Sequence, residues 1–362
     1  MNHSDNNIDE ESVIGFDALY ESMHKCVKGV LWKGSVSSFF LNGIERTINL
    51  EKALKEGTYK AYPPSQFKVT YPKERDILSI AFRDRVYQRS LNDNAIYPCM
   101  TRGFIRDNCA CQRGKGTDDA RNRLVCFLQK CHRQGGKWCV LQCDIHGYYP
   151  NMTHSVAKET FRRSLGVCIY NRTERVLDEQ YAGEVGFNPG SQMVQIAGIS
   201  VLNPLDHFIK EKLHIKYYIR YMDDFILIHR DRKYLVYCKE QIQMKLNEMG
   251  FEFNPKKSRI YPLQTGIMFL GFKFILTDSG KVLRILNPEN IRHERKKLYR
   301  LVKRAMKGEM TKAKVDDCYA GWRNHAEHGN SFKLLQRMDN YYKDLWKGAK
   351  CYEIQVSENQ CC

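Results

Sequence analysis

The chain has 362 residues, of which 43% are hydrophobic and 12% aromatic, and its 58 Lys and Arg residues against 41 Asp and Glu give a formal net charge of +17. This is enough apolar material for a packed core in two or three lobes, and no stretch reaches the roughly 18 consecutive apolar residues of a membrane-spanning helix. The positive charge favours a polyanionic partner, nucleic acid first, although a merely basic soluble protein has the same balance.

The fourteen cysteines predict reduced thiols rather than a disulfide framework. The chain is long and its first thirty residues are polar, without the apolar core of a signal peptide, so we expect a cytoplasmic protein. Cys109 and Cys111 form one close pair and Cys139 and Cys143 another, but neither has a second pair at zinc-finger spacing. We therefore expect these thiols to be buried as small hydrophobes rather than to bind metal.

The first third of the chain is predicted to be mainly helical. Residues 1–13 are expected to be disordered, whereas residues 16–55 have helical periodicity, with Phe16, Leu19, Tyr20 and Met23 on one face. Residues 67–72 alternate like a strand, and an amphipathic helix follows around residues 83–86. Residues 109–117, CACQRGKGT, form a glycine-punctuated basic loop that opens a helix at 118–129. Its backbone amides are suited to holding phosphates, but a plain solvated turn has the same composition.

The middle of the chain alternates buried strands with helices. Residues 138–145 are an apolar run that ends on Asp144, a turn follows at 146–150, and a helix begins near Thr153. An acid at the end of a central strand is suited to binding metal, although capping a helix is an equal alternative. A Gly, Pro and Asn loop then leads into a helix whose small residues permit close packing, namely Ala197, Gly198 and Ser200.

Residues 215–229, IKYYIRYMDDFILIH, predict a strand, a tight turn and a second strand, with Asp223 and Asp224 at the tip. Adjacent carboxylates between apolar flanks repel one another, and a bound cation is the usual remedy. An ordinary acidic turn is the alternative, since Asp is common in turns.

After this hairpin we expect a helix at 234–249, a short strand at 251–253, and a hairpin of 268–274 with 282–285. The region 291–305 predicts a helix with one apolar and one strongly basic face.

The order of these segments over residues 60–345 resembles a reverse transcriptase. DIHGYY is similar to motif A, GFNPGSQMVQ to motif B, YMDD to motif C, NPKKS to motif D and FLGF to the primer-grip motif E. The segment from Lys73 to Arg85 and the loop CACQRGKGT resemble the two fingers motifs, and Asn324, His325 and Ala326 resemble a thumb segment. The likeness is greatest to the small bacterial enzymes of diversity-generating retroelements, group II introns and phage-defence systems.

The resemblance implies an α+β right-hand polymerase fold with fingers, an antiparallel-sheet palm and a helical thumb. The expected divisions are a helical N-terminal extension at 1–58, fingers at 59–135, palm at 136–280 with fingers elements near 160–190, thumb at 281–350 and a tail at 351–362.

The implied activity is RNA-directed DNA synthesis, in which dNTPs are added to a primer 3′-hydroxyl. Such an in-line displacement uses two Mg²⁺ ions about 3.5–4 Å apart, which prefer carboxylate oxygens; Mn²⁺ is an alternative ion. By resemblance, Asp144 and Asp223 bridge both ions, Asp224 is the supporting acid and Ile145 contributes a backbone carbonyl.

The resemblance also suggests residues that contact the nucleotide and the nucleic acid. Tyr149 would lie under the sugar and exclude a 2′-hydroxyl, and Lys257 would protonate the departing pyrophosphate or offset its charge. The remaining expected nucleotide contacts are Arg75, Arg113, Lys115 and Gln195. The basic helix face would hold the duplex backbone through Arg292, Arg295, Lys296 and Arg300.

Two departures from the family pattern leave the biological role open. Gln112 stands where relatives often carry Arg, and motif B reads PGSQMVQ, in which only Gln195 matches the diversity-generating pattern. Phage defence with a structured companion non-coding RNA and a diversity-generating retroelement are both expected roles, in a bacterial cytoplasm and without membrane contact. A homo-oligomer or an accessory protein is a further expected partner. The alternatives are a catalytically silent RNA-binding protein, or template-independent or protein-primed DNA synthesis.

Overall fold

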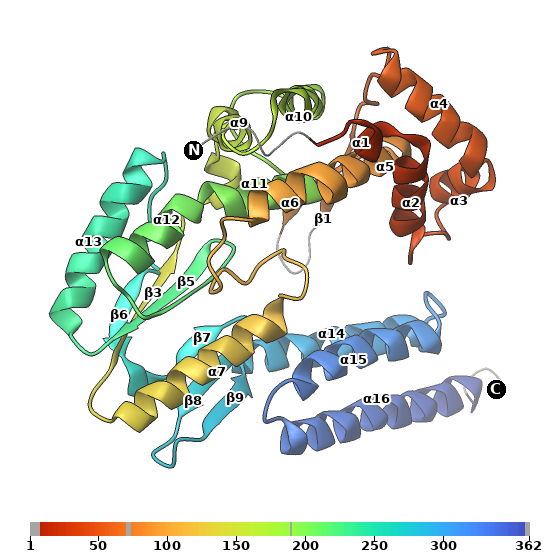
Figure 1. Cartoon of the computed structure of the whole chain (residues 1–362). Coiled ribbons are helices and arrows are strands. Elements are labelled where there is room, and N and C mark those ends of the chain that lie inside the picture. The colour runs from red at the N-terminus through yellow and green to blue at the C-terminus, as the bar shows by residue number, and fades with distance from the viewer. Residues whose placement is uncertain (1–7, 70–73, 189, 359–362) are drawn as a thin grey trace. The chain divides into compact units, whose positions relative to one another are not determined.

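The structure is a computed structural model that describes residues 8–69, 74–188 and 190–358. The chain divides into two compact units, of which unit 1 comprises Met1–Ala120 with Leu141–Ile260, and unit 2 comprises Arg121–Val140 with Tyr261–Cys362. Figure 1 shows the helices and strands of both. In the described part of the chain, no helix has the length and apolarity needed to span a bilayer.

The N-terminal region of unit 1 is helical, as its periodicity predicts. Its helices are α1 (Glu11–Ile14), α2 (Phe16–Val27), α3 (Gly34–Leu41) and α4 (Gly43–Lys55). Leu19 and Met23 of the predicted face are buried, and α2 packs against α4 and α5 (Phe82–Leu91). The prediction of disorder over residues 1–13 is wrong for α1, because Val13 and Ile14 are buried; residues 1–7 lie outside the described part.

The predicted strand at 67–72 belongs to a hairpin of β1 (Ser65–Val69) and β2 (Arg75–Ser79), in which Phe67 pairs with Ile77. Residues 70–73 lie outside the described part. After α5 the chain continues through a π-helical turn (Asn92–Ile96), α6 (Tyr97–Thr101), the basic loop and α7 (Thr117–Gln134).

A four-stranded sheet carries the two acidic segments. Its strands are β3 (Cys139–Asp144), β4 (Tyr217–Tyr221), β5 (Asp224–His229) and β6 (Arg259–Pro262), in the order β4-β5-β3-β6. Val140, Leu141 and Cys143 of β3 are fully buried, as expected of a central strand. The predicted strand at 251–253 is wrong: Phe253 makes a single bridge to Ile145, and the longer pairing with β3 is made by β6.

The helices of unit 1 between β3 and β6 are α8 (Tyr148–Asn151), α9 (His154–Arg162), α10 (Val167–Gln180), α11 (Gln192–Val201), α12 (Asn203–His207) and α13 (Arg232–Glu248). α11 is apolar around most of its circumference and contacts α5, α6, α9 and α12. A helix buried on all sides is part of the core, so side chains that touch α11 have little freedom to shift.

The described part of unit 2 contains most of α7, a three-stranded antiparallel sheet and three C-terminal helices. The sheet is β7 (Ile267–Phe269), β8 (Phe272–Leu276) and β9 (Val282–Leu286) in that order. The predicted strand at 268–274 is therefore two strands that pair with each other, and the predicted pairing with 282–285 is made by β8 alone. The helices are α14 (Pro288–Met306), α15 (Lys312–Glu327) and α16 (Phe332–Glu358). Leu298, Tyr319 and Met338 form their shared core.

The predicted burial of the paired cysteines is half right. Cys109 and Cys143 are buried, whereas Cys111 and Cys139 are partly exposed. All four are free thiols.

Candidate active site

The acid pair lies at the tip of the β4–β5 hairpin, as predicted. Tyr221 pairs with Asp224, which leaves Met222 and Asp223 as a two-residue turn. Met222 has a φ of 58°, a left-handed conformation that costs a residue with a side chain about 1–3 kcal/mol. The turn is therefore strained, and it presents two half-buried carboxylates at the end of the hairpin.

Asp144 ends β3, the strand that lies beside β5 in the sheet. Its carboxylate is 6% exposed and accepts a hydrogen bond from Lys257 Nζ at Oδ1 (2.9 Å) and one from Asn254 Nδ2 at Oδ2 (3.0 Å). Its backbone amide donates to Ser258 Oγ (3.2 Å). The segment resembling motif D thus encloses the carboxylate from one side.

The three carboxylates act on one another electrostatically. Burial raises the pKa of Asp223, and the charge of Asp144 adds to the rise, while Lys257 and Arg220 oppose it. Burial raises the pKa of Asp224 to about 7, and the charges of Asp223 and Asp144 contribute. Such a cluster of like charges in a partly desolvated place is stabilised by a cation.

Among the described residues, no three His, Cys, Asp or Glu side chains are arranged as a ready-made metal cage. Both oxygens of Asp144 are bonded to Lys257 and Asn254, so the Lys257 ammonium is the cation nearest this acid. The donor chemistry nevertheless fits a divalent ion, because three hard carboxylates act on one another here and Mg²⁺ prefers such oxygens.

The backbone carbonyl of Ile145 is oriented away from the neighbouring segment. Ile145 forms a single antiparallel bridge with Phe253, and Asn254 N donates to Asp144 O (2.7 Å) beside it. In this kind of pair the amide and carbonyl of the bridged residue point away from the partner strand. Ile145 O is therefore not used in that bridge and remains suited to the role predicted for it.

The two tyrosines after Asp144 occupy different places. Tyr148 is buried and its hydroxyl donates to Gly198 O (2.5 Å), so it is part of the core. Tyr149 is partly exposed, and burial raises the pKa of its phenol, with the charges of Cys111 and Asp223 adding to the rise. Tyr149 thus lies near the hairpin turn that carries Asp223.

The three residues that were predicted to hold the triphosphate lie in different surroundings. Lys115 Nζ donates to the backbone carbonyls of Arg106 (3.2 Å) and Asn108 (3.0 Å), so its ammonium is bonded to the segment just before the loop. The Arg113 side chain is 68% exposed and its guanidinium lies 4.9 Å from the Tyr97 ring centroid. Arg75 is the first residue of β2. Within the described part of the chain, neither Lys115 nor Arg113 makes a hydrogen bond or ion pair with the carboxylates, and the Arg75 side chain lies outside that part.

Cys111 connects this loop to the hairpin turn. The sequence predicted only that this thiol is buried as a small hydrophobe, and it gave no sign of that contact. Its Sγ lies 3.8 Å from Gln195 Oε1 on α11 and 3.7 Å from Met222 Sδ in the hairpin turn. Its backbone is also left-handed, with a φ of 51°. Gln195 and Met222 thus both contact the Cys111 side chain.

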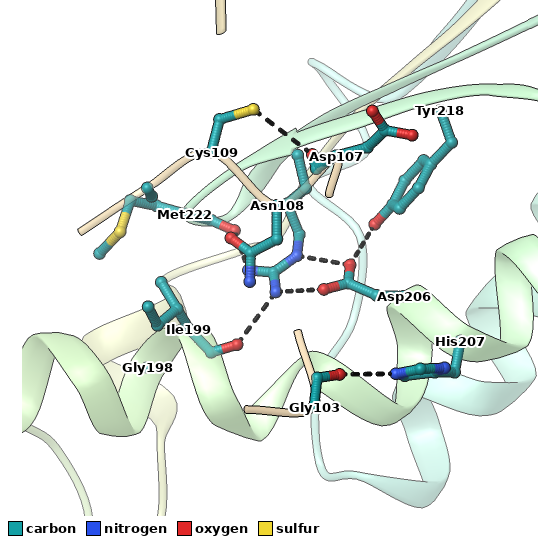
Figure 2. Close-up of polar contacts among 12 residues, drawn as sticks. Gly103, Asp107, Asn108, Cys109, Gly198, Ile199, Asp206, His207, Tyr218 and Met222 are labelled. Atoms are coloured by element: carbon teal, nitrogen blue, oxygen red, sulfur yellow. Dashed lines mark hydrogen bonds and ion pairs between the residues drawn. The ribbon is translucent and has the colours of Figure 1, made fainter. Parts of the chain in front are cut away.

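A buried ion pair next to the hairpin turn was also not predicted from the sequence. Arg220 and Asp206 are both fully buried, and two guanidinium nitrogens donate to the two oxygens of Asp206 (2.6 and 2.5 Å). Arg220 also donates to Met222 O (2.9 Å) and to Ile199 O (3.0 Å). Tyr218 Oη donates to Asp206 Oδ1 (2.6 Å), as Figure 2 shows.

Arg220 is bonded through its backbone as well. Its amide donates to Asp107 O (2.9 Å), and its carbonyl accepts from Cys109 N (3.0 Å). One residue thus ties together β4, the strained turn, α11, α12 and the start of the basic loop. The sequence held a signal for it, because a charge inside a buried strand requires a partner.

The four predicted nucleic-acid contacts lie on one helix of unit 2. Arg292, Arg295, Lys296 and Arg300 are exposed on α14, whose Leu298 faces the core of its unit. The Arg295 guanidinium stacks 4.3 Å from the Tyr341 ring centroid. The amphipathic pattern therefore gives the exposed basic face that it predicts.

Comparison with known proteins adds one finding. Residues 73–274, more than half of the chain, match the family described as "Reverse transcriptase (RNA-dependent DNA polymerase)". No curated protein matches the chain. The matched region includes Asp144, Asp223, Asp224 and Lys257.

Proposed function

This chain belongs to the reverse transcriptase family of RNA-directed DNA polymerases, and from this premise we propose that Asp144, Asp223 and Asp224 form its catalytic centre with two Mg²⁺ ions. The observation that supports the proposal is the electrostatic coupling of the three acids, two from the hairpin turn and one from the strand beside it. When bound, the two ions supply charge stabilisation to the attacking and leaving oxygens of the displacement. The three carboxylates and Ile145 O would hold them.

Lys257 has two successive roles in this proposal. Its ammonium bonds Asp144 Oδ1 and offsets the charge of the acids, and this bond raises the pKa of Lys257. The Lys257 side chain is 58% exposed, so it is free to leave that oxygen when metal ions and nucleotide bind. A protonated Lys257 would then donate its proton to the departing pyrophosphate, a contribution of general-acid type.

The nucleotide would lie between the turn and α11. Tyr149, near Asp223, would exclude a 2′-hydroxyl, and Gln195 would contact the base or nucleotide from α11. Arg75, Arg113 and Lys115 would hold the triphosphate, which requires Lys115 to release its two backbone carbonyls. The exposed basic face of α14 would hold the backbone of the template–primer duplex without reading its sequence.

For the biological role we propose DNA synthesis on a structured companion non-coding RNA in bacterial phage defence, or on the template of a diversity-generating retroelement. The support is the variant motif B, with Gln195 on α11. Sequencing the cDNA made in cells distinguishes the two, because defence predicts copies of one non-coding RNA and diversity generation predicts copies with errors at adenines.

Primer extension on an RNA template with dNTPs tests the catalytic centre. We expect the Asp223→Asn, Asp224→Asn double variant to lose extension while it retains template–primer affinity, which shows that it is folded. Asp178→Asn is the matched control, because this exposed acid lies on α10 and pairs only with Lys158 among the described residues (2.6 Å). Extension by the double variant at the wild-type rate would refute the proposal.

Two alternatives have their own results in the same assay. A catalytically silent RNA-binding protein would bind template–primer tightly and extend it in no variant. Protein-primed synthesis would give a product that stays attached to the protein in denaturant.

A further inference from the structure

Gly198 lies in the interior of α11, where a Cβ atom would clash with the Tyr149 ring. A Cβ atom there would stand 2.6 Å from Tyr149 Oη, 2.9 Å from its Cζ and 3.0 Å from its Cε1. Distances below 3.0 Å do not occur between such atoms, so a side chain at 198 must displace the ring. Glycine is a poor helix former, and Gly198 has no left-handed backbone that would require it. Its lack of a Cβ is used for this close approach.

The helix cannot retreat to make the room. Tyr148 Oη donates to Gly198 O (2.5 Å), and this bond ties α11 to α8, the short helix that carries Tyr149. The next residue, Ile199, is fully buried and its carbonyl accepts from Arg220 (3.0 Å); Figure 2 shows Gly198 and Ile199 on this helix. A clash at 198 is therefore relieved by movement of the tyrosine ring and not of the helix.

The Tyr149 ring also lies near the hairpin turn. The charges of Cys111 and Asp223 act on its phenol, and Cys111 Sγ lies 3.7 Å from Met222 Sδ in that turn. Its hydroxyl is buried and has no hydrogen-bond partner among the described residues. No hydrogen bond of this hydroxyl would be broken by a shift, and a ring displaced from α11 would change the surface that Tyr149 presents to an incoming nucleotide.

We propose that Gly198 is a positioning residue that sets how far Tyr149 reaches into the nucleotide site, and so determines how the enzyme fits the sugar of the incoming dNTP. This rests on the proposed function of Tyr149 as the residue that excludes a 2′-hydroxyl. Gly198 itself touches no substrate; it acts through the ring. It follows that substitution at 198 matters only while an aromatic ring is present at 149.

The experiment is a double-mutant cycle of Gly198→Ala and Tyr149→Val, read as the KM and kcat for dNTPs and rNTPs in primer extension. We expect Gly198→Ala to raise the KM for dNTPs roughly ten- to hundredfold, the size of effect produced by a misplacement of about 1 Å. In the Tyr149→Val background the same change should alter KM less than twofold. Gly34→Ala, where a Cβ has open space, is the control for replacing glycine at a helix.

Equal effects of Gly198→Ala in both backgrounds, or no effect in either, would overturn the proposal. If Gly198→Ala does not fold but the double variant does, the ring contact is again responsible and the proposal stands; if neither folds, it falls. The exclusion of a 2′-hydroxyl by Tyr149 is measured separately. Tyr149→Val should raise the incorporation of rNTPs relative to that of dNTPs. An unchanged ratio would reject that assignment, while the coupling in dNTP KM would still report the contact.

Discussion

The buried pair of Arg220 and Asp206 offers a quantitative test of how the hairpin turn is held. Asp206→Leu removes the carboxylate and leaves the guanidinium charged at a place with no solvent exposure. Removing one partner of a buried ion pair costs about 3–5 kcal/mol. We expect Asp206→Leu to lose stability in that range, with a further contribution of about 1 kcal/mol from the Tyr218 hydroxyl, which loses its acceptor.

The double variant Asp206→Leu, Arg220→Met removes both charges and should recover most of this loss, because hydrophobic replacement of a whole buried pair is often near neutral. Recovery should be incomplete, since the carbonyls of Ile199 and Met222 lose their donor at about 1 kcal/mol each. We therefore expect the double variant to lie about 1–3 kcal/mol below wild type.

The assay is urea unfolding followed by far-UV circular dichroism, with the slope of the transition compared across variants. Glu248→Gln is the control, because Glu248 is 62% exposed and pairs with Lys245 at the surface (2.6 Å), where such pairs contribute less than about 1 kcal/mol. A single variant that loses less than the control, or a double variant no more stable than the single, would refute the reasoning. Met222 O loses its donor only in the double variant, so extension by that variant reports whether the strained turn needs Arg220.

Two further predictions concern the proposed contacts. Lys257→Met should slow primer extension about 10²–10⁴-fold, the usual contribution of a general acid, with template–primer affinity unchanged; full activity would exclude Lys257 from proton transfer. Arg300→Gln should weaken template–primer binding and lower the slope of log affinity against log salt by about one, measured by fluorescence anisotropy. Lys52→Gln on α4 also removes an exposed charge and should leave that slope unchanged. An unchanged slope for Arg300→Gln would show that this side chain does not contact the phosphates.

The sequence by itself determined the local elements and the family. Alternation over residues 215–229 predicted the hairpin with its acid pair, because side chains alternate across a strand and turn residues interrupt the pattern. Helical periodicity predicted the buried Leu298 and the exposed basic face of α14 in the same way. The order of the motifs predicted the reverse transcriptase family, which the family match confirms.

Partners between distant segments were decided only by tertiary structure. Nothing local says that Lys257 will bond Asp144, that Lys115 will bond the segment just before its loop, or that Gly198 will lie against Tyr149. Periodicity records which side of an element is buried, whereas the neighbour across the core depends on strand order and helix packing. The segment 251–253 shows the same limit, because it has the pattern of a strand but β6 takes the place beside β3. The sequence thus identified the acids of the site, and the fold decided which groups surround and position them.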